Sequence, residues 1–262
     1  MSAVETLRLH CKALRLPTAA QVMEETLARA QREDWSLEQG VLHLFEQELA
    51  GRQRRRITRL LKESHLPEGK TLSTFDQQRL PVRVRRLLAE LSAGDFIERG
   101  DNILLFGLPG TGKTHLAVAL GYEWVQNNYP VLFTPTYLLV SGLLRAKRDY
   151  ELERELRRLD RFDVVILDDI GYVQQSREEM EVLFTFLAER YERRTVVITS
   201  NLVFSEWDKI FKDPLTTAAA IDRIVHHSLI IEFGSDMKSV RAEEAARRNR
   251  LAIPQSEPTA GT

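Results

Sequence analysis

Apolar residues along the chain follow two patterns, helical spacing and short continuous runs. From residue 96 onward the two patterns take turns, which is typical of a parallel sheet with helical crossovers. The apolar runs predict strands at residues 103–106, 131–134, 164–167, 195–199 and 228–233. Helices are predicted between them at residues 113–127, 136–159 with a break, 176–192, and 205–224 in pieces. We therefore expect an α/β fold with a five-stranded parallel sheet between helices.

Residues 1 to about 65 follow helical spacing alone. One stripe predicts a first helix, and a second helix is predicted after Pro17. Ser36 and Gln39 resemble a capping box that opens a third helix, which stops near Pro67. We expect the buried side of this third helix to carry Leu37, Val41, Leu44, Phe45 and Leu49.

The most informative motif follows the first predicted strand. Residues 107–114 read G-L-P-G-T-G-K-T, a complete P-loop between a strand and a helix. The glycines let backbone N–H groups turn toward phosphates, and the helix N-terminus adds partial positive charge. Lys113 would reach the β- and γ-phosphates, and the Thr114 hydroxyl would bind Mg²⁺. The nucleotide-binding residues are expected to be Gly107, Pro109, Gly110, Thr111, Gly112, Lys113, Thr114 and His115. The chain is predicted to bind a nucleoside triphosphate.

The strand at 164–167 ends in two carboxylates, Asp168 and Asp169, which is the Walker B arrangement. Asp168 would hold Mg²⁺, directly or through water, and Asp169 would orient and deprotonate the attacking water. The alternative is a strand that simply ends in a polar turn.

Two later residues extend this site. Asn201 follows the strand at 195–199 and could position water near the γ-phosphate, or it could be an Asx-turn residue. Arg223 follows Asp222 at the end of a helix rich in small residues. It could stabilise the γ-phosphate of a neighbouring protomer as an arginine finger, or it could pair with Asp222.

His226 and His227 are not expected to bind a metal. Adjacent residues at the entrance to a strand point in opposite directions, and no Cys or His partner stands at ligand spacing. Met180 and the stripe of Leu183, Phe184 and Leu187 are expected to pack in the core.

Charge suggests a second ligand. The net charge is only −1, but residues 52–62 carry six cations and no acid. Nucleic-acid phosphate would compensate them, and a solvated surface or internal ion pairs are the alternatives. The cations of this basic run are Arg52, Arg54, Arg55, Arg56, Arg59 and Lys62. Arg145, Lys147 and Arg148 could also face DNA, or could belong to an ordinary solvated helix.

No apolar run approaches the roughly 18 residues that span a bilayer, and the first 15 residues lack the apolar core of a signal peptide. Cys11 is the only cysteine, which fits a reducing compartment. We expect a cytoplasmic protein without membrane contacts.

Taken together, the chain resembles a AAA+ ATPase, and within that class the IstB family of transposition helpers. The resemblance covers about residues 5–250 and is most specific between Ser200 and His227. It implies ATP and Mg²⁺ as cofactors, and a homo-oligomer, either a ring or a filament, on duplex DNA. It also implies that the assembly recruits or stimulates the transposase of the same element. In the site it implies that Asp169 is the catalytic base, Asn201 the sensor-1 residue and Arg223 a finger that acts in trans.

We expect four regions along the chain. These are an N-terminal helical domain for DNA or partner binding (1–66), a linker with a lead-in helix (67–95), a AAA+ domain (96–250) and a disordered tail (251–262).

Two features depart from the family. Asp169 stands where Glu is more common, which would slow turnover. Only 29 residues follow Phe233, which predicts a truncated lid, with Arg241 as the nearest candidate for sensor 2 or else a surface arginine.

The rival functions are a DnaC-type helicase loader and an ATP-switched DNA-binding assembly with negligible turnover.

Overall fold

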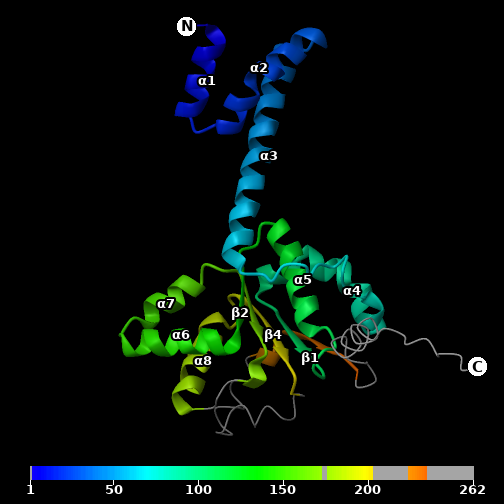
Figure 1. Ribbon diagram of the computed structural model, residues 1–262, viewed down its shortest axis with the longest axis vertical. Helices are drawn as coiled ribbons and strands as arrows, with labels where there is room; N and C mark the ends of the chain where they lie inside the picture. The colour runs from blue at the N-terminus through cyan, green and yellow to red at the C-terminus, as the bar shows by residue number, and fades with distance from the viewer. Residues whose placement is uncertain (1, 173–175, 203–223, 235–262) are drawn as a thin grey trace, which may run out of the picture. The chain divides into compact units, whose positions relative to one another are not determined.

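The fold is taken from a computed structural model (Figure 1), which describes residues 2–172, 176–202 and 224–234. The chain divides into two compact units, Met1–Lys62 and Glu63–Thr262.

The N-terminal unit is helical. Helix α1 (Ala3–Ala13) starts at a capping box between Ser2 and Glu5, and packs against α2 (Pro17–Arg32). Helix α3 (Leu37–Ser64) carries the basic run. The predicted Ser36–Gln39 capping box is present, because Ser36 N donates to Gln39 Oε1 at 2.7 Å and Gln39 N donates to Ser36 Oγ at 3.3 Å.

The expected buried side of α3 is wrong. Leu37 is 81% exposed, Phe45 53% and Leu49 67%. The face of α3 that is covered instead carries Glu48 and Gly51. Glu48 accepts hydrogen bonds from the first N–H groups of α2, and an added Cβ at Gly51 would collide with Thr18. A polar helix cap and a close backbone approach therefore decide which face packs, and apolar periodicity cannot reveal either.

The C-terminal unit contains the predicted five-stranded parallel sheet. Its strands are β1 (Asn102–Phe106), β2 (Val131–Pro135), β3 (Val164–Asp168), β4 (Thr195–Ser200) and β5 (Ser228–Glu232). They lie in the order β2-β3-β4-β1-β5, and every pair is parallel. Each strand matches its predicted range to within a residue at either end.

Helices cover both faces of this sheet. Helix α5 (Lys113–Gln126) contacts four of the strands on one face, with α4 (Val82–Ala93) against it. The other face carries α6 (Thr136–Arg148), α7 (Leu152–Leu159) and α8 (Arg177–Arg190), whose apolar side chains form one core with the strands (Figure 1). Short 3₁₀ turns occupy Gln77–Arg79, Asp95–Arg99 and Ile170–Tyr172. This is the three-layer arrangement that the sequence predicts.

The predicted break in the helix at 136–159 is confirmed. Helix α6 ends at Arg148, and Tyr150 has a positive φ of 57° before α7 begins. The core positions predicted on α8 are also confirmed, since Met180, Leu183 and Leu187 are buried and Phe184 packs against them. The helical pieces predicted at 205–224 fall, apart from Ile224, outside the described residues.

Candidate functional site

The candidate site lies where the carboxyl ends of β1, β3 and β4 meet. Because the strands are parallel, the P-loop after β1, the two aspartates at the end of β3 and Asn201 after β4 share one edge of the sheet. Gly107, Gly110 and Gly112 have φ of 148°, 80° and 106°, which side-chain-bearing residues rarely adopt. The sequence needs glycine at these three positions to turn the loop back into α5.

Lys113 is held inside this site. Its ammonium group donates to Gly107 O at 2.7 Å, Leu108 O at 2.9 Å and Asn201 Oδ1 at 2.8 Å. The side chain is only 6% exposed, so these oxygens replace the water that its charge requires.

Asp168 is the centre of a cluster of hydroxyl groups. Its Oδ1 accepts a hydrogen bond from Thr114 Oγ1 and another from Thr199 Oγ1, both at 2.7 Å. The sequence predicts the Thr114–Asp168 pair but not Thr199. A side chain of β4 that lies beside β3 only through strand order leaves no local signal in the sequence.

Asp169 is held by Asn201 and Thr199. Asn201 Nδ2 donates to both carboxylate oxygens, at 2.9 and 3.1 Å, and the Asp169 backbone N–H donates to Thr199 Oγ1 at 2.9 Å. Asp169 itself has a φ of 61°, an uncommon left-handed conformation for a residue with a side chain. A strained residue directly after a buried strand is a common feature of functional sites.

His115 connects the site to the segment before α4. Its Nε2 lies 3.2 Å from Thr71 O and 3.1 Å from Thr74 Oγ1, and its ring meets Phe75 edge-on. Burial lowers the pKa of His115, and the positive charge of Lys70 lowers it further. The hydrogen bond with Thr71 O raises the pKa but does not outweigh burial. The imidazole is therefore mostly neutral at pH 7. Lys70, Thr71, Thr74 and Phe75 are neighbours of the site that its motifs do not reveal.

The cleft is small and polar, with a volume of about 260 Å³. It is lined by Lys70, Pro109, Gly110, Gly112, Lys113, Thr114, His115, Asp168, Asp169, Thr199 and Asn201. A larger cavity of about 470 Å³ lies at the opposite end of β1, but it contains none of the P-loop or Walker B residues. Phosphate chemistry therefore belongs to the smaller cleft. Of the residues predicted for the nucleotide site, Gly107 and Thr111 belong to the P-loop but do not line the cleft, and Arg223, like Arg241, lies outside the described residues.

The basic run of α3 is partly engaged within the protein. Glu48, 2% exposed, pairs with Arg52 at 2.9 Å and with Arg55 at 3.1 Å, and Arg55 also donates to Thr18 Oγ1. Burial raises the pKa of Glu48, but hydrogen bonds from Arg52 and from the Ala19 and Thr18 N–H groups outweigh it and lower the pKa overall. The alternative of internal ion pairs is thus realised for Arg52 and Arg55. Arg54, Arg59 and Lys62 form no ion pair with any described residue.

A second basic surface surrounds the end of α6. Lys147 pairs with Glu181 of α8 at 2.7 Å, whereas Arg145 lines an open cleft of about 550 Å³. Other arginines that the sequence analysis did not select line the same cleft, namely Arg154, Arg157, Arg158 and Arg161. Three of them pair with neighbouring glutamates, so part of this charge is neutralised.

One argument against a metal at His226 and His227 does not hold. They lie in the turn before β5, so the alternation of side chains along a strand does not apply to them. Their ring centroids are 4.3 Å apart, and Glu192 lies beside them.

Among the described helices, none combines the length and the hydropathy that a bilayer crossing requires.

Comparisons with known proteins agree with this geometry. Residues 9–246 match the family described as IstB-like ATP binding protein. The chain is 43% identical over 238 residues to an insertion-sequence ATP-binding protein of Sinorhizobium fredii (strain NBRC 101917 / NGR234), covering 90% of this chain and 80% of that one. It is 36% identical to the IS21 insertion-sequence ATP-binding protein of Pseudomonas aeruginosa, covering 90% of each chain.

Solved structures share the fold at lower identity. The DnaC helicase loader matches with a TM-score of 0.50 and 20% identity, over 64% of this chain and 98% of that one. AMPPCP-bound DnaA from Aquifex aeolicus matches with a TM-score of 0.56 and 17% identity, over 74% and 59%. The sheet and its helices are therefore of the AAA+ P-loop type, and the chain belongs to the IstB-like ATP-binding family.

Proposed function

We propose that this protein is an ATPase that assembles on duplex DNA and recruits or stimulates the transposase of its insertion sequence. The observation that carries the ATPase part is the convergence of Lys113, Asp168, Asp169 and Asn201 in one cleft. The transposition part rests on the relatives, which are named as insertion-sequence proteins.

The residues of the cleft divide the work of hydrolysis. Lys113 and the P-loop N–H groups hold the phosphates, and Asn201 positions the attacking water. Asp169 accepts a proton from that water. The water oxygen bonds to the γ-phosphorus as the bond between the γ-phosphorus and ADP breaks. Thr114 and Asp168 fit Mg²⁺, because their oxygens lie 2.7 Å apart and hard cations prefer oxygen ligands. When bound there, the ion would neutralise phosphate charge.

Hydrolysis is proposed to require a neighbouring protomer. Arg223 lies outside the described residues, so its role as a finger that acts in trans rests on the resemblance to AAA+ ATPases and on the match of residues 9–246 to the IstB-like family.

Mixing two inactive variants tests this proposal. Lys113→Ala removes phosphate binding and Arg223→Ala removes the finger, so each variant alone should lose ATP hydrolysis. In a mixed assembly with DNA, an intact Lys113 site can meet an intact Arg223 from its neighbour. We expect the mixture to recover hydrolysis, with Lys113→Ala mixed with Lys113→Ala/Arg223→Ala as the inactive control.

Two results would contradict the trans mechanism. Full activity of Arg223→Ala alone would show that no finger is needed. Failure of the mixture to recover, while both variants still co-assemble, would show that the finger acts within one chain.

A turnover assay of the wild-type chain with DNA separates an ATPase from a switch that uses ATP only for assembly.

DNA binding is proposed for α3. Arg52, Arg55, Arg59 and Lys62 follow one another at three- and four-residue intervals, which puts them on one face of the helix. Arg52 and Arg55 remain 51% exposed although Glu48 orients them. A row of extended cations on a single helix face suits the phosphate backbone of a duplex. The second basic surface, with Arg145 and the proposed contacts Lys147 and Arg148, would add to it.

A further inference from the structure

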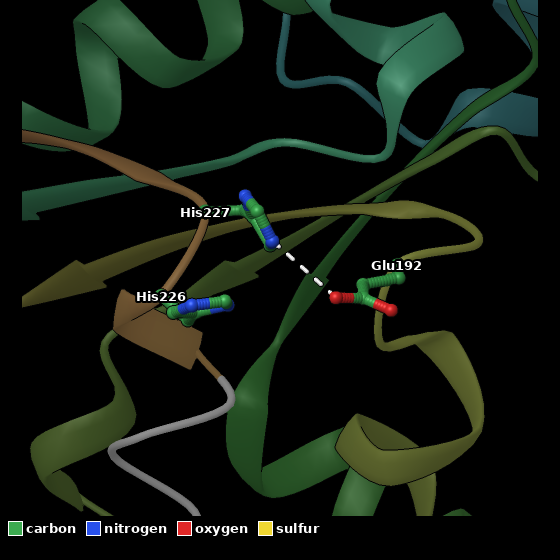
Figure 2. A group of neighbouring side chains, drawn as sticks. All are labelled: Glu192, His226 and His227. Atoms are coloured by element: carbon green, nitrogen blue, oxygen red, sulfur yellow. Dashed lines mark ion pairs between the residues drawn. The ribbon is translucent and has the colours of Figure 1, made fainter.

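A second cluster of potential ligands lies outside the nucleotide cleft. Glu192, His226 and His227 each offer one ligand atom, and these atoms all lie within 4.8 Å of one another (Figure 2). His227 Nε2 is 3.3 Å from Glu192 Oε1. The cluster is exposed and lies at the amino end of β5, the edge of the sheet opposite Lys113.

The backbone that carries the two histidines is firmly placed. His227 O accepts a hydrogen bond from Asn102 N at 2.7 Å, and the Asn102 side chain bonds Ile224 O on one side and Val196 N on the other. One buried asparagine therefore ties the histidine turn to β1 and β4.

The turn that carries Glu192 is also constrained. Glu192 adopts a φ of 55°, and its carbonyl carbon lies so close to Gly100 that an added Cβ there would approach it to 3.0 Å. The three ligand-bearing residues thus come from two fixed turns, and only their side chains need to adjust.

A neighbouring hydroxyl orients one of the imidazoles. Tyr191 Oη lies 3.2 Å from His226 Nδ1, which leaves Nε2 of that ring for another partner. Histidine ligands of metals usually have such an outer partner on the second ring nitrogen. An ion pair between Glu192 and His227 alone would not account for the placement of His226, whose ring stands edge-on to His227.

We propose that Glu192, His226 and His227 form a site for one divalent transition-metal ion of the zinc class, completed by water. Two imidazole nitrogens and one carboxylate oxygen suit zinc, nickel or cobalt and disfavour Mg²⁺, which prefers oxygen ligands. With metal–ligand distances of about 2.0–2.2 Å, ligands of a tetrahedral ion stand about 3.4 Å apart. His227 and Glu192 already have this spacing, and His226 must close the remaining gap.

Zinc titration of the full-length chain without nucleotide tests the site, in competition with a chromophoric chelator. We expect one ion per chain, and a loss of affinity of at least tenfold in Glu192→Gln, His226→Ala and His227→Ala. Tyr191→Phe should weaken binding by about 10- to 100-fold, the usual effect of an outer partner. His10→Ala, which removes an exposed histidine of α1, is the matched control and should bind as the wild type does.

Cobalt absorption gives a second readout that does not depend on activity. The wild-type chain should show a visible ligand-field band that His226→Ala and His227→Ala lose, while thermal unfolding without metal stays unchanged. Equal zinc affinity in the wild type and all three ligand variants would overturn the proposal. A stoichiometry of one ion per two chains would also overturn it, since it would show that histidines of separate molecules share the ion.

Discussion

At the scale of single residues, Thr199 is the position that most sharpens the site. Its hydroxyl donates to Asp168 and accepts from the Asp169 N–H, so one buried side chain fixes both Walker B residues. We expect it to act through the two aspartates.

We predict that Thr199→Val lowers the rate of ATP turnover and changes how that rate depends on Mg²⁺ concentration. Loss of a hydrogen bond to a charged group costs about 1.5–3 kcal/mol, which corresponds to roughly 10- to 150-fold. The rate of steady-state hydrolysis, measured against Mg²⁺ concentration, reports both effects. Thr199→Ser, which keeps the hydroxyl group, should restore the wild-type values. Thr195→Val is the control, because Thr195 is equally buried on β4 but bonds Asp101 O, far from the cleft. An unchanged Mg²⁺ dependence in Thr199→Val would refute the positioning role.

Glu48 is the second decisive residue, because it caps α2 and pairs with two arginines. We predict that Glu48→Gln destabilises the protein by about 1–3 kcal/mol, since the arginines and the N–H groups of α2 lose a charged acceptor. The pKa of Glu48 lies below its ordinary value of 4.5 in the folded state, so its stabilisation is present above that pH. It is lost as the pH falls through the folded pKa. Urea unfolding from pH 7 down to pH 3 should show the two proteins converging at the acidic end; a constant difference would contradict this origin.

At the scale of elements, strands are the features that the sequence predicts best. In β3 the residues from Val164 to Leu167 are all apolar and buried, three of the four are β-branched, and this pattern is typical of a strand inside a parallel sheet. The P-loop and Walker B motifs are local, so their residues can be found without the fold. Thr199 and Phe75 enter the site only through strand order and a returning segment, and no local pattern marks them.

Helix α3 shows where periodicity fails. Its apolar stripe is exposed because a buried carboxylate and a glycine decide which face packs. The pattern also misleads at His226 and His227. These residues seem to begin a strand, but they belong to the turn before it.

A pair of substitutions tests the corrected face of α3. We predict that Phe45→Ser, at an exposed position, changes the free energy of unfolding by no more than about 0.5 kcal/mol. Leu116→Ala, at a position of α5 with no exposed surface, should cost about 2–5 kcal/mol. Denaturant titration measures both, and a large loss in Phe45→Ser would show that the stripe is covered within the chain.

At the scale of the whole molecule, the proposed DNA contacts depend on how many cations remain to meet phosphates. Each phosphate contact contributes about −0.9 to the slope of log affinity against log salt. We predict that Arg59→Ala/Lys62→Ala makes this slope shallower by about 2 and weakens binding to all duplexes alike. Fluorescence anisotropy across a salt series measures it. Arg8→Ala is the control, because Arg8 belongs to the same unit and pairs with Glu24 at 2.8 Å. An unchanged slope in the double variant would place the DNA elsewhere.

The hydrogen bonds of Lys113 have a consequence for the order of events at the nucleotide. Its ammonium group donates to Asn201 Oδ1 as well as to the Gly107 and Leu108 carbonyl oxygens. Asn201 is also the amide that holds both oxygens of Asp169. Lys113 and Asp169 are thus joined through one amide, and we expect a phosphate that draws Lys113 away from Asn201 to shift the base as well.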